Sequence, residues 1–194
     1  MTDLLGKTEK FFPAKEVKKP DFSTFVSFAI ETTGLGRKSD IIEIGAVKVV
    51  NGMLTDSFCE FVNPDVLIPP AITNLTGIDD DMVKDAGKIY DVLPLFRDFA
   101  GNNILVGHNA LNFDCKIMGH WADEYGIYIG CDVFDTVRFA RYRCEPFPGM
   151  KSHKLSYMCD YFGIQAKTYH RAAADAEVTA ELYLKLQKYG KTKK

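Results

Sequence analysis

The stretch FVSFAIETTGL, residues 25–35, decides the fold of this chain. Its apolar and aromatic residues predict a buried strand, which ends at the polar turn that begins with Glu31. Residues i and i+2 of a strand share a face, so the position for a second acid beside Glu31 is Ala29. Two such acids can bind a pair of cations at a sheet edge, whereas a single acid also fits a simple strand end. The stretch alone leaves both interpretations open.

The sequence on either side of this stretch predicts a mixed α/β domain. Asn51-Gly52 is a strong hairpin signal between two runs rich in β-branched and aromatic residues. Strands are expected at residues 23–30, 40–50, 53–62, 102–108 and 127–134. Helices are expected at residues 89–99, 113–125, 135–144, 152–162 and 171–189. A meander followed by alternating helices and strands indicates a mixed five-stranded sheet with helices on both faces.

Length and composition limit the classes of protein to which the chain can belong. A chain of 194 residues fits one domain, which we expect at residues 24–190, after an N-terminal arm (1–23) and before a basic tail (191–194). The net charge of −2 gives no global basic footprint. Five scattered cysteines without a C-x-x-C pair argue against structural zinc and a disulfide framework. The sequence has no signal-peptide or membrane-spanning run, so we expect a cytoplasmic protein without a membrane partner.

A second polar motif is VGHNALNFD, residues 106–114, where a short strand gives way to a helix. Asp114 falls in an early helical turn, where the helix dipole favours an anion. Met118, Trp121 and Tyr125 follow at helical spacing, so the carboxylate lies on an apolar face. A buried charge needs a partner such as a metal ion. The alternative is an ordinary acid at a helix start.

A third motif is YHRAAADAEVTAELYL, residues 169–184, whose alanine-rich sequence predicts a helix with Asp175 early in it. His170 lies five residues earlier, so we place it in the loop that enters the helix, where it could also be a surface or capping histidine. Together, the three motifs supply carboxylates and a histidine to one α/β sheet. Two-metal phosphoryl transfer uses these groups: oxygen ligands hold two Mg²⁺ or Mn²⁺ ions and histidine accepts a proton.

FAIETTGL, VGHNALNFD and HRAAADAEVTA resemble, in order, the three motifs of the DEDDh (DnaQ-like) 3′–5′ exonucleases. IIEIGAVKV, PAITNLTGI and SHKLSYMCDYFGI are also typical of this family, so the resemblance covers about residues 24–188. It implies an RNase H-like fold. It also implies that Glu31, Asp114 and Asp175 are ligands of two Mg²⁺ or Mn²⁺ ions and that His170 is the general base.

The first aspartate of the family motif falls on Ala29. Because that aspartate bridges both metal ions in the family, this form of the chain is expected to be inactive or strongly impaired. An Asp-to-Ala change made to disable the enzyme fits the other four intact positions better than natural decay, which would erode several of them. A natural non-catalytic nucleic-acid binder and a structural subunit remain alternatives. The codon at the source locus distinguishes an engineered alanine from a natural one.

The resemblance implies a substrate with a single-stranded 3′ end, of DNA or RNA. Main-chain groups around Thr32 and Thr33 are expected to hold the terminal sugar, Leu35 to pack on the last bases, and Asn109 to make a polar contact. A plain glycine turn and a core leucine are the alternatives. Basic side chains that either follow phosphates or form a solvated face are Arg138, Arg141, Arg143, Lys151 and Lys154.

Members of the family work in three settings: as proofreading subunits of DNA polymerases, as repair or RNA-trimming enzymes, and as trimmers of DNA for CRISPR integration. A polymerase or a CRISPR integrase complex is therefore a candidate partner. The sequence does not choose between these pathways.

Overall fold

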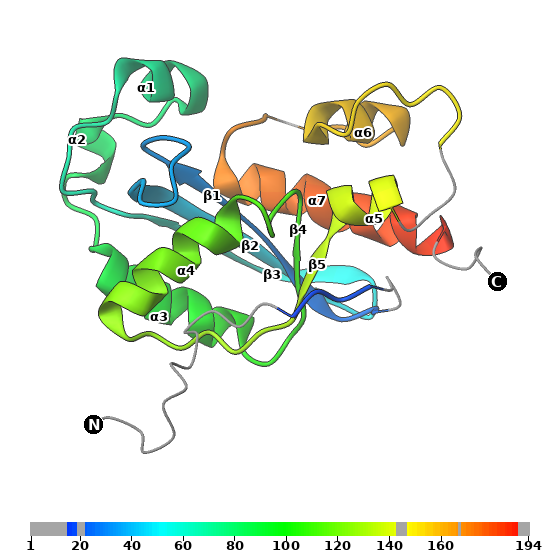
Figure 1. Ribbon diagram of the computed structural model, residues 1–194, viewed down its shortest axis with the longest axis horizontal. Helices are drawn as coiled ribbons and strands as arrows, with labels where there is room; N and C mark the ends of the chain where they lie inside the picture. Colours follow the sequence, from blue (N-terminus) through cyan, green and yellow to red (C-terminus); the bar gives the residue numbers. More distant parts are fainter. Residues whose placement is uncertain (1–14, 19–21, 143–146, 167, 190–194) are drawn as a thin grey trace.

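The computed structural model describes residues 15–18, 22–142, 147–166 and 168–189, which form a mixed sheet between two layers of helices (Figure 1). The strands are β1 (Phe25–Thr32), β2 (Ile41–Val50), β3 (Met53–Phe61), β4 (Leu105–Gly107) and β5 (Val133–Asp135). The helices are α1 (Pro70–Thr76), α2 (Asp80–Val83), α3 (Ile89–Ala100), α4 (Asp114–Tyr125), α5 (Thr136–Tyr142), α6 (Leu155–Tyr161), α7 (Ala172–Leu186) and the 3₁₀ turn η1 (Gln187–Tyr189). The predicted five-stranded α/β architecture is confirmed.

The sheet has the order β3-β2-β1-β4-β5, with β1 at its centre. β1 and β3 each run antiparallel to β2, whereas β4 and β5 continue the sheet in parallel. Asn51 and Gly52 form the hairpin turn predicted between β2 and β3, and both have positive φ angles (52° and 77°), as a tight type I′ turn requires. The central strand therefore ends beside β2 and close to the loop after β4.

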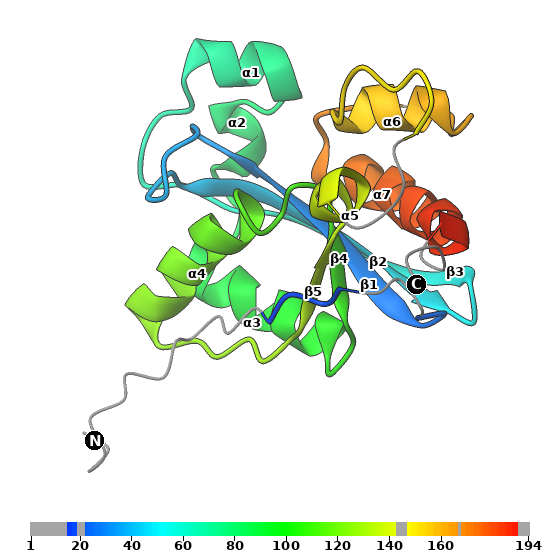
Figure 2. The ribbon, with the colours of Figure 1, turned by 45° about the vertical axis from the view of Figure 1, so that its right-hand side comes forward.

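Alternation along β1 divides its side chains between two cores. Val26, Phe28 and Ile30 pack into the core that α3 and α4 cover. Phe25 belongs to the other core, where its ring lies 4.5 Å from that of Tyr183 in α7. Since odd-numbered residues of β1 share the face of Phe25, Ala29 and Glu31 project toward α7. Figure 2 shows α7 crossing this face, with α6 outside it.

The last strand is shorter than the sequence predicts. β5 begins only at Val133, although Ile127 and Ile129 are buried in the α3–α4 core. These two isoleucines enter the core from irregular backbone. A pattern of apolar residues in the sequence predicts that they are buried, but it cannot distinguish irregular backbone from a strand. Residues 15–17 pair with β5, because Val17 N donates to the Val133 oxygen (2.7 Å) and Val133 N donates to the Lys15 oxygen (2.9 Å). Of the expected arm, the structure also describes residues 18, 22 and 23. The rest of the arm and the whole expected tail lie outside the described residues.

None of the helices in the described part of the chain is both long and apolar enough to cross a membrane.

Candidate active site

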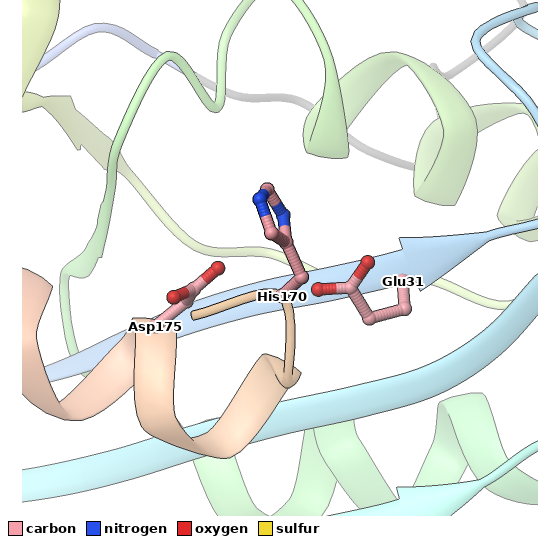
Figure 3. Close-up of side chains that lie close together, drawn as sticks. All are labelled: Glu31, His170 and Asp175. Atoms are coloured by element: carbon pink, nitrogen blue, oxygen red, sulfur yellow. The ribbon is translucent and has the colours of Figure 1, made fainter. Parts of the chain in front are cut away.

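Three of the predicted site residues converge where β1 ends. Glu31 comes from the end of β1, His170 from the loop before α7 and Asp175 from the first turn of α7 (Figure 3). One potential ligand atom from each side chain lies within 4.8 Å of the others. Residues separated by more than a hundred positions in the sequence thus form a single acidic cluster with a histidine beside it.

A partly buried ion pair that we did not predict, between Glu43 and Arg171, fixes the start of α7. The carboxylate of Glu43, in β2 and opposite Glu31 in the sheet register, is fully buried. It accepts hydrogen bonds from Arg171 Nη2 (2.6 Å), Arg171 Nε (3.1 Å) and the Ala172 amide (2.7 Å). The charge of Glu43 therefore caps the helix N-terminus and holds Arg171 and Ala172, the first two of the four residues between His170 and Asp175. An isolated acid inside the apolar run IIEIGAV was the sequence signal for it.

Gly45 allows α7 to start directly on the sheet. A Cβ atom at this position would lie 2.1 Å from the amide nitrogen of Ala173, so only glycine permits the contact. Gly45 is the register partner of Ala29. The start of α7 is thereby placed against the β2 backbone, beside the strand that carries Ala29 and Glu31.

Two residues beside the cluster have unusual backbone conformations. His170 and Asn109 have φ angles of 60° and 61°, in the left-handed region that non-glycine residues seldom adopt. Both line the same cavity next to Asp175. Strained residues at a cleft point to a functional constraint on their position. His170 lies in the loop before α7, as the sequence predicts.

Asp114 is the first residue of α4 and is buried, but it lies outside the group of three. Its Oδ1 atom accepts a hydrogen bond from the Ile30 amide (3.1 Å), which ties α4 to the residue before Glu31. The loop that leads to Asp114 is held in turn by Asp135, whose Oδ2 accepts from the Leu111 amide (3.0 Å). His108 contacts Thr136 Oγ1 (2.8 Å) and the His153 oxygen (2.9 Å) from the same loop. The sequence interpretation missed these supporting residues.

The exonuclease family model matches residues 26–183. The chain belongs to the exonuclease family. The exonuclease domain is 44% identical over 163 residues to the PolC-type DNA polymerase III of Caldanaerobacter subterraneus subsp. tengcongensis, covering 84% of this chain but only 11% of that protein. It is 36% identical over 165 residues to the DNA polymerase III subunit epsilon of Aquifex aeolicus, covering 84% of this chain and 80% of the relative.

Solved structures agree with the RNase H-like fold. Exonuclease X, in a complex with 5′ overhanging duplex DNA, matches the exonuclease domain with a TM-score of 0.69 and 25% identity, over 84% of this chain and 91% of that one. Exonuclease I of E. coli, in a complex with a dT13 oligonucleotide, matches with a TM-score of 0.74 and 18% identity, over 87% and 42% of the two chains. The second likeness supports the fold alone.

Three carboxyl groups at the candidate site, those of Glu31, Asp114 and Asp175, have raised pKa values. Burial and the nearby charges of Asp175, Glu43 and Asp114 raise the pKa of Glu31 to about 8. Burial raises the pKa of Asp114 to about 7 and that of Asp175 to about 6. Asp175 Oδ1 is also buried, without a hydrogen-bond partner among the described residues. A crowded, desolvated group of hard oxygen donors fits a divalent cation, which would compensate both the repulsion and the orphaned oxygen.

The predicted substrate contacts lie around this cluster. Thr32 Oγ1 donates to the Gly34 oxygen (2.6 Å) and Thr33 Oγ1 accepts from the Asp40 amide (3.0 Å), so both side chains stabilise the turn. Leu35 is 86% exposed, so the alternative that it is a core residue is wrong. Asn109 is exposed at the rim of the cavity.

The predicted basic residues divide into different groups. Arg138 bonds to Glu16 (3.5 Å) and Asn112 Oδ1 (3.2 Å), which favours a structural role over phosphate binding. Arg141 and Lys154 line the cavity beside Asp175. Lys151 is exposed, and Arg143 lies outside the described residues.

The raised pKa of Glu31 predicts that the metal-free domain loses stability as pH rises from 6.5 to 8. The folded state keeps a proton that the unfolded state, with an ordinary pKa of 4.5, has already released, so folding weakens as pH approaches 8. His108 does not mask the effect, because burial lowers its pKa to about 4 and it is mostly neutral in both states above pH 6.5. We expect a fall of about 1 to 2 kcal/mol.

Urea unfolding in EDTA at pH 6.5, 7.2 and 8 measures this fall. Glu31→Gln is the matched control, because it cannot ionise; it should reduce the dependence to the smaller part that Asp114 contributes, and stabilise the domain at pH 8. A free energy of unfolding that rises with pH over this window would contradict the assignment.

Proposed function

We propose that this exonuclease domain belongs to the metal-dependent 3′–5′ enzymes that release nucleotides from single-stranded ends. The observation that carries the proposal is the convergence of Glu31, His170 and Asp175, with a potential ligand atom of each within 4.8 Å, at the junction of two cavities. The preferred substrate is DNA, and RNA is the second candidate.

Glu31, Asp114 and Asp175 would hold two Mg²⁺ or Mn²⁺ ions between β1, α4 and α7. Bound there, the ions would supply an activated water and neutralise charge on the leaving oxygen. His170 is the general base in this proposal. His170 is exposed beside the carboxylates, in the loop before α7. The next residue of this loop, Arg171, is held by Glu43. The His170 ring can therefore reach a water beside the carboxylates.

Ala29 leaves this site without one carboxylate. It lies two residues before Glu31 on the same face of β1 and lines the cavity that contains Glu31, Asp114 and Asp175. A longer acidic side chain would therefore enter the cavity. We infer that the present form is disabled at this position by an engineered Asp-to-Ala change. Its rival is a natural pseudo-nuclease that binds single strands without cleaving them, which the same alanine would also explain.

A proofreading role beside a DNA polymerase is the most direct biological setting. The two relatives described above are named as a PolC-type DNA polymerase III and a DNA polymerase III subunit epsilon. The exonuclease domain spans about a tenth of the PolC-type relative, so association with a polymerase is part of the proposal. These relatives favour a polymerase over a CRISPR integrase complex as the partner. A replication role would place the domain in the cytoplasm.

Titration with Mn²⁺ tests the metal site in the chain as it stands. The signal of free Mn²⁺ in electron paramagnetic resonance should fall as the domain binds the ion, and Glu31→Gln or Asp175→Asn should weaken the binding by more than about tenfold. Glu60→Gln is the matched control, because Glu60 is an exposed acid on β3 away from the cluster. Binding that is absent, or unaffected by the two cluster variants, would overturn the metal assignment and favour a structural subunit.

A further inference from the structure

Two cavities meet at the acidic cluster. One, of about 290 Å³, is lined by residues of β1 and α1, and the other, of about 760 Å³, by residues of α5, α6 and the loops beside them. Their walls share His108, Leu155, His170 and Asp175. In both views α1 and α6 stand on opposite sides of the end of β1 (Figures 1 and 2). A ligand across the cluster would therefore have one part on the α1 side and one on the α6 side.

The two walls differ in chemistry. The α1 side presents apolar side chains, including Leu35, Ile72 and Leu75. The α6 side presents Arg141 and Lys154, and the remainder of its wall is formed by histidine, serine, tyrosine, asparagine and apolar residues. Among the described residues that line this wall, Asp175, at the junction itself, is the one acidic residue. The cavity on the α1 side is thus suited to an apolar group, and the cavity on the α6 side is suited to an anion.

Arg141 is distinct from the other arginines that the structure describes. Arg37, Arg97, Arg138 and Arg171 each have a carboxylate oxygen within 4.0 Å. Within the described ranges no carboxylate lies at that distance from Arg141, which is exposed in the cavity wall. Burial is the main cause of the lowered pKa of both His108 and His153, and the positive charge of Arg141 nearby lowers both further. An exposed guanidinium without an acid is well suited to a phosphate.

We propose that the α6-side cavity binds the phosphates on the 5′ side of the scissile phosphate in the substrate strand, with Arg141 and Lys154 as the phosphate contacts. The proposal rests on the exonuclease function and sets the polarity of the strand. Its 3′-terminal nucleoside lies on the apolar α1 side, the scissile phosphate lies at the carboxylates, and the 5′ body passes over α6. Contacts of this kind position a strand without reading its sequence.

Length and salt dependence test the proposal on the chain as it stands, which we expect to bind oligonucleotides without cutting them. Fluorescence anisotropy would compare dT12 with dTMP in Mg²⁺ at several salt concentrations, for the parent and for Arg141→Ala/Lys154→Ala. We expect the double variant to bind dT12 about 10- to 100-fold more weakly, with a salt slope lower by about 1.4, since each phosphate contact on a single strand contributes about 0.7. Arg37→Ala is the control, because Arg37 is exposed, faces Asp123 and lines neither cavity.

Cleavage in the Ala29→Asp background gives the second readout. The dinucleotide dTpdT contains only the scissile phosphate, so the double variant should cut it within about threefold of the parent rate while losing at least tenfold in kcat/KM on dT12. The proposal would be overturned by equal losses of activity on both substrates or by an unchanged salt slope. A loss confined to dTMP binding would also overturn it, because this result would place the released nucleotide in the α6-side cavity. If dTpdT is still cut in any of these cases, the exonuclease function stands. If the Ala29→Asp domain hydrolyses no oligonucleotide of any length, the exonuclease function itself is refuted.

Discussion

Ala29→Asp is expected to give the domain Mg²⁺- or Mn²⁺-dependent hydrolysis of single-stranded 3′ ends, at least about 10³-fold faster than the chain as it stands. Position 29 shares a strand face with Glu31 and opens into the cavity that holds Asp114 and Asp175. A carboxylate there would add a fourth hard oxygen ligand to the cluster. The release of nucleotides from dT12 and from a matched RNA, resolved by gel electrophoresis, measures the gain.

Two variants separate charge from shape in this experiment. Ala29→Asn has nearly the volume of aspartate without its charge, so it should remain inactive. Ala29→Asp combined with Asp175→Asn restores one ligand and removes another, and it should lose most of the gain. If Ala29→Asp is folded, as judged by circular dichroism and an unchanged melting transition, and still cuts neither DNA nor RNA, the exonuclease proposal fails and a binding role replaces it.

Glu43→Ala is expected to lower the free energy of unfolding by about 2 to 4 kcal/mol and to weaken Mn²⁺ binding at the same time. The fully buried Glu43 carboxylate is the acceptor for Arg171 and for the Ala172 amide, so its removal leaves both donors unpaired. Because these donors begin α7 and follow His170, the loss also frees the histidine and Asp175 from their fixed positions. Urea unfolding and the Mn²⁺ titration measure the two effects.

A double-mutant cycle identifies the ion pair as the cause. If Glu43 and Arg171 act together, Glu43→Ala with Arg171→Ala should cost less than the sum of the single changes. Glu43→Gln retains an acceptor for the Ala172 amide and should recover part of both the stability and the metal affinity. A Glu43→Ala variant that loses stability but binds Mn²⁺ as the parent does would limit Glu43 to a structural role.

The fold could be predicted from the sequence because local signals agree along the chain. The turn at Asn51-Gly52, the helical spacing after Asp114 and the alanine-rich helix with Asp175 each indicate the element that the structure contains. Ile127 and Ile129 depart from this agreement: both are buried, but they lie in irregular backbone rather than in a strand. A pattern of burial identifies core residues more reliably than it identifies hydrogen-bonded strands.

The residues of the acidic cluster could be predicted from the sequence, but the residues that support it could not. Glu31, His170 and Asp175 stand in motifs whose composition is unusual for a strand end or a helix start, and the structure brings them together. Glu43 was missed because its role depends on α7 beginning against β2, a contact between residues 128 positions apart in the chain. The lack of a carboxylate beside Arg141 among the described residues could not be predicted either, because only the folded structure shows which arginines lie close to an acid.

The direction of degradation tests the central claim most directly. A single strand with different fluorophores at its 5′ end and at an internal base near that end, incubated with the Ala29→Asp domain and Mg²⁺, reports which end is shortened. Stepwise shortening from the 3′ end, with both labels kept together until the last steps and nucleotides released, is the predicted result. An intact strand, early release of the 5′ label, or cuts that begin inside the strand would contradict a 3′–5′ exonuclease built on Glu31, Asp114, His170 and Asp175.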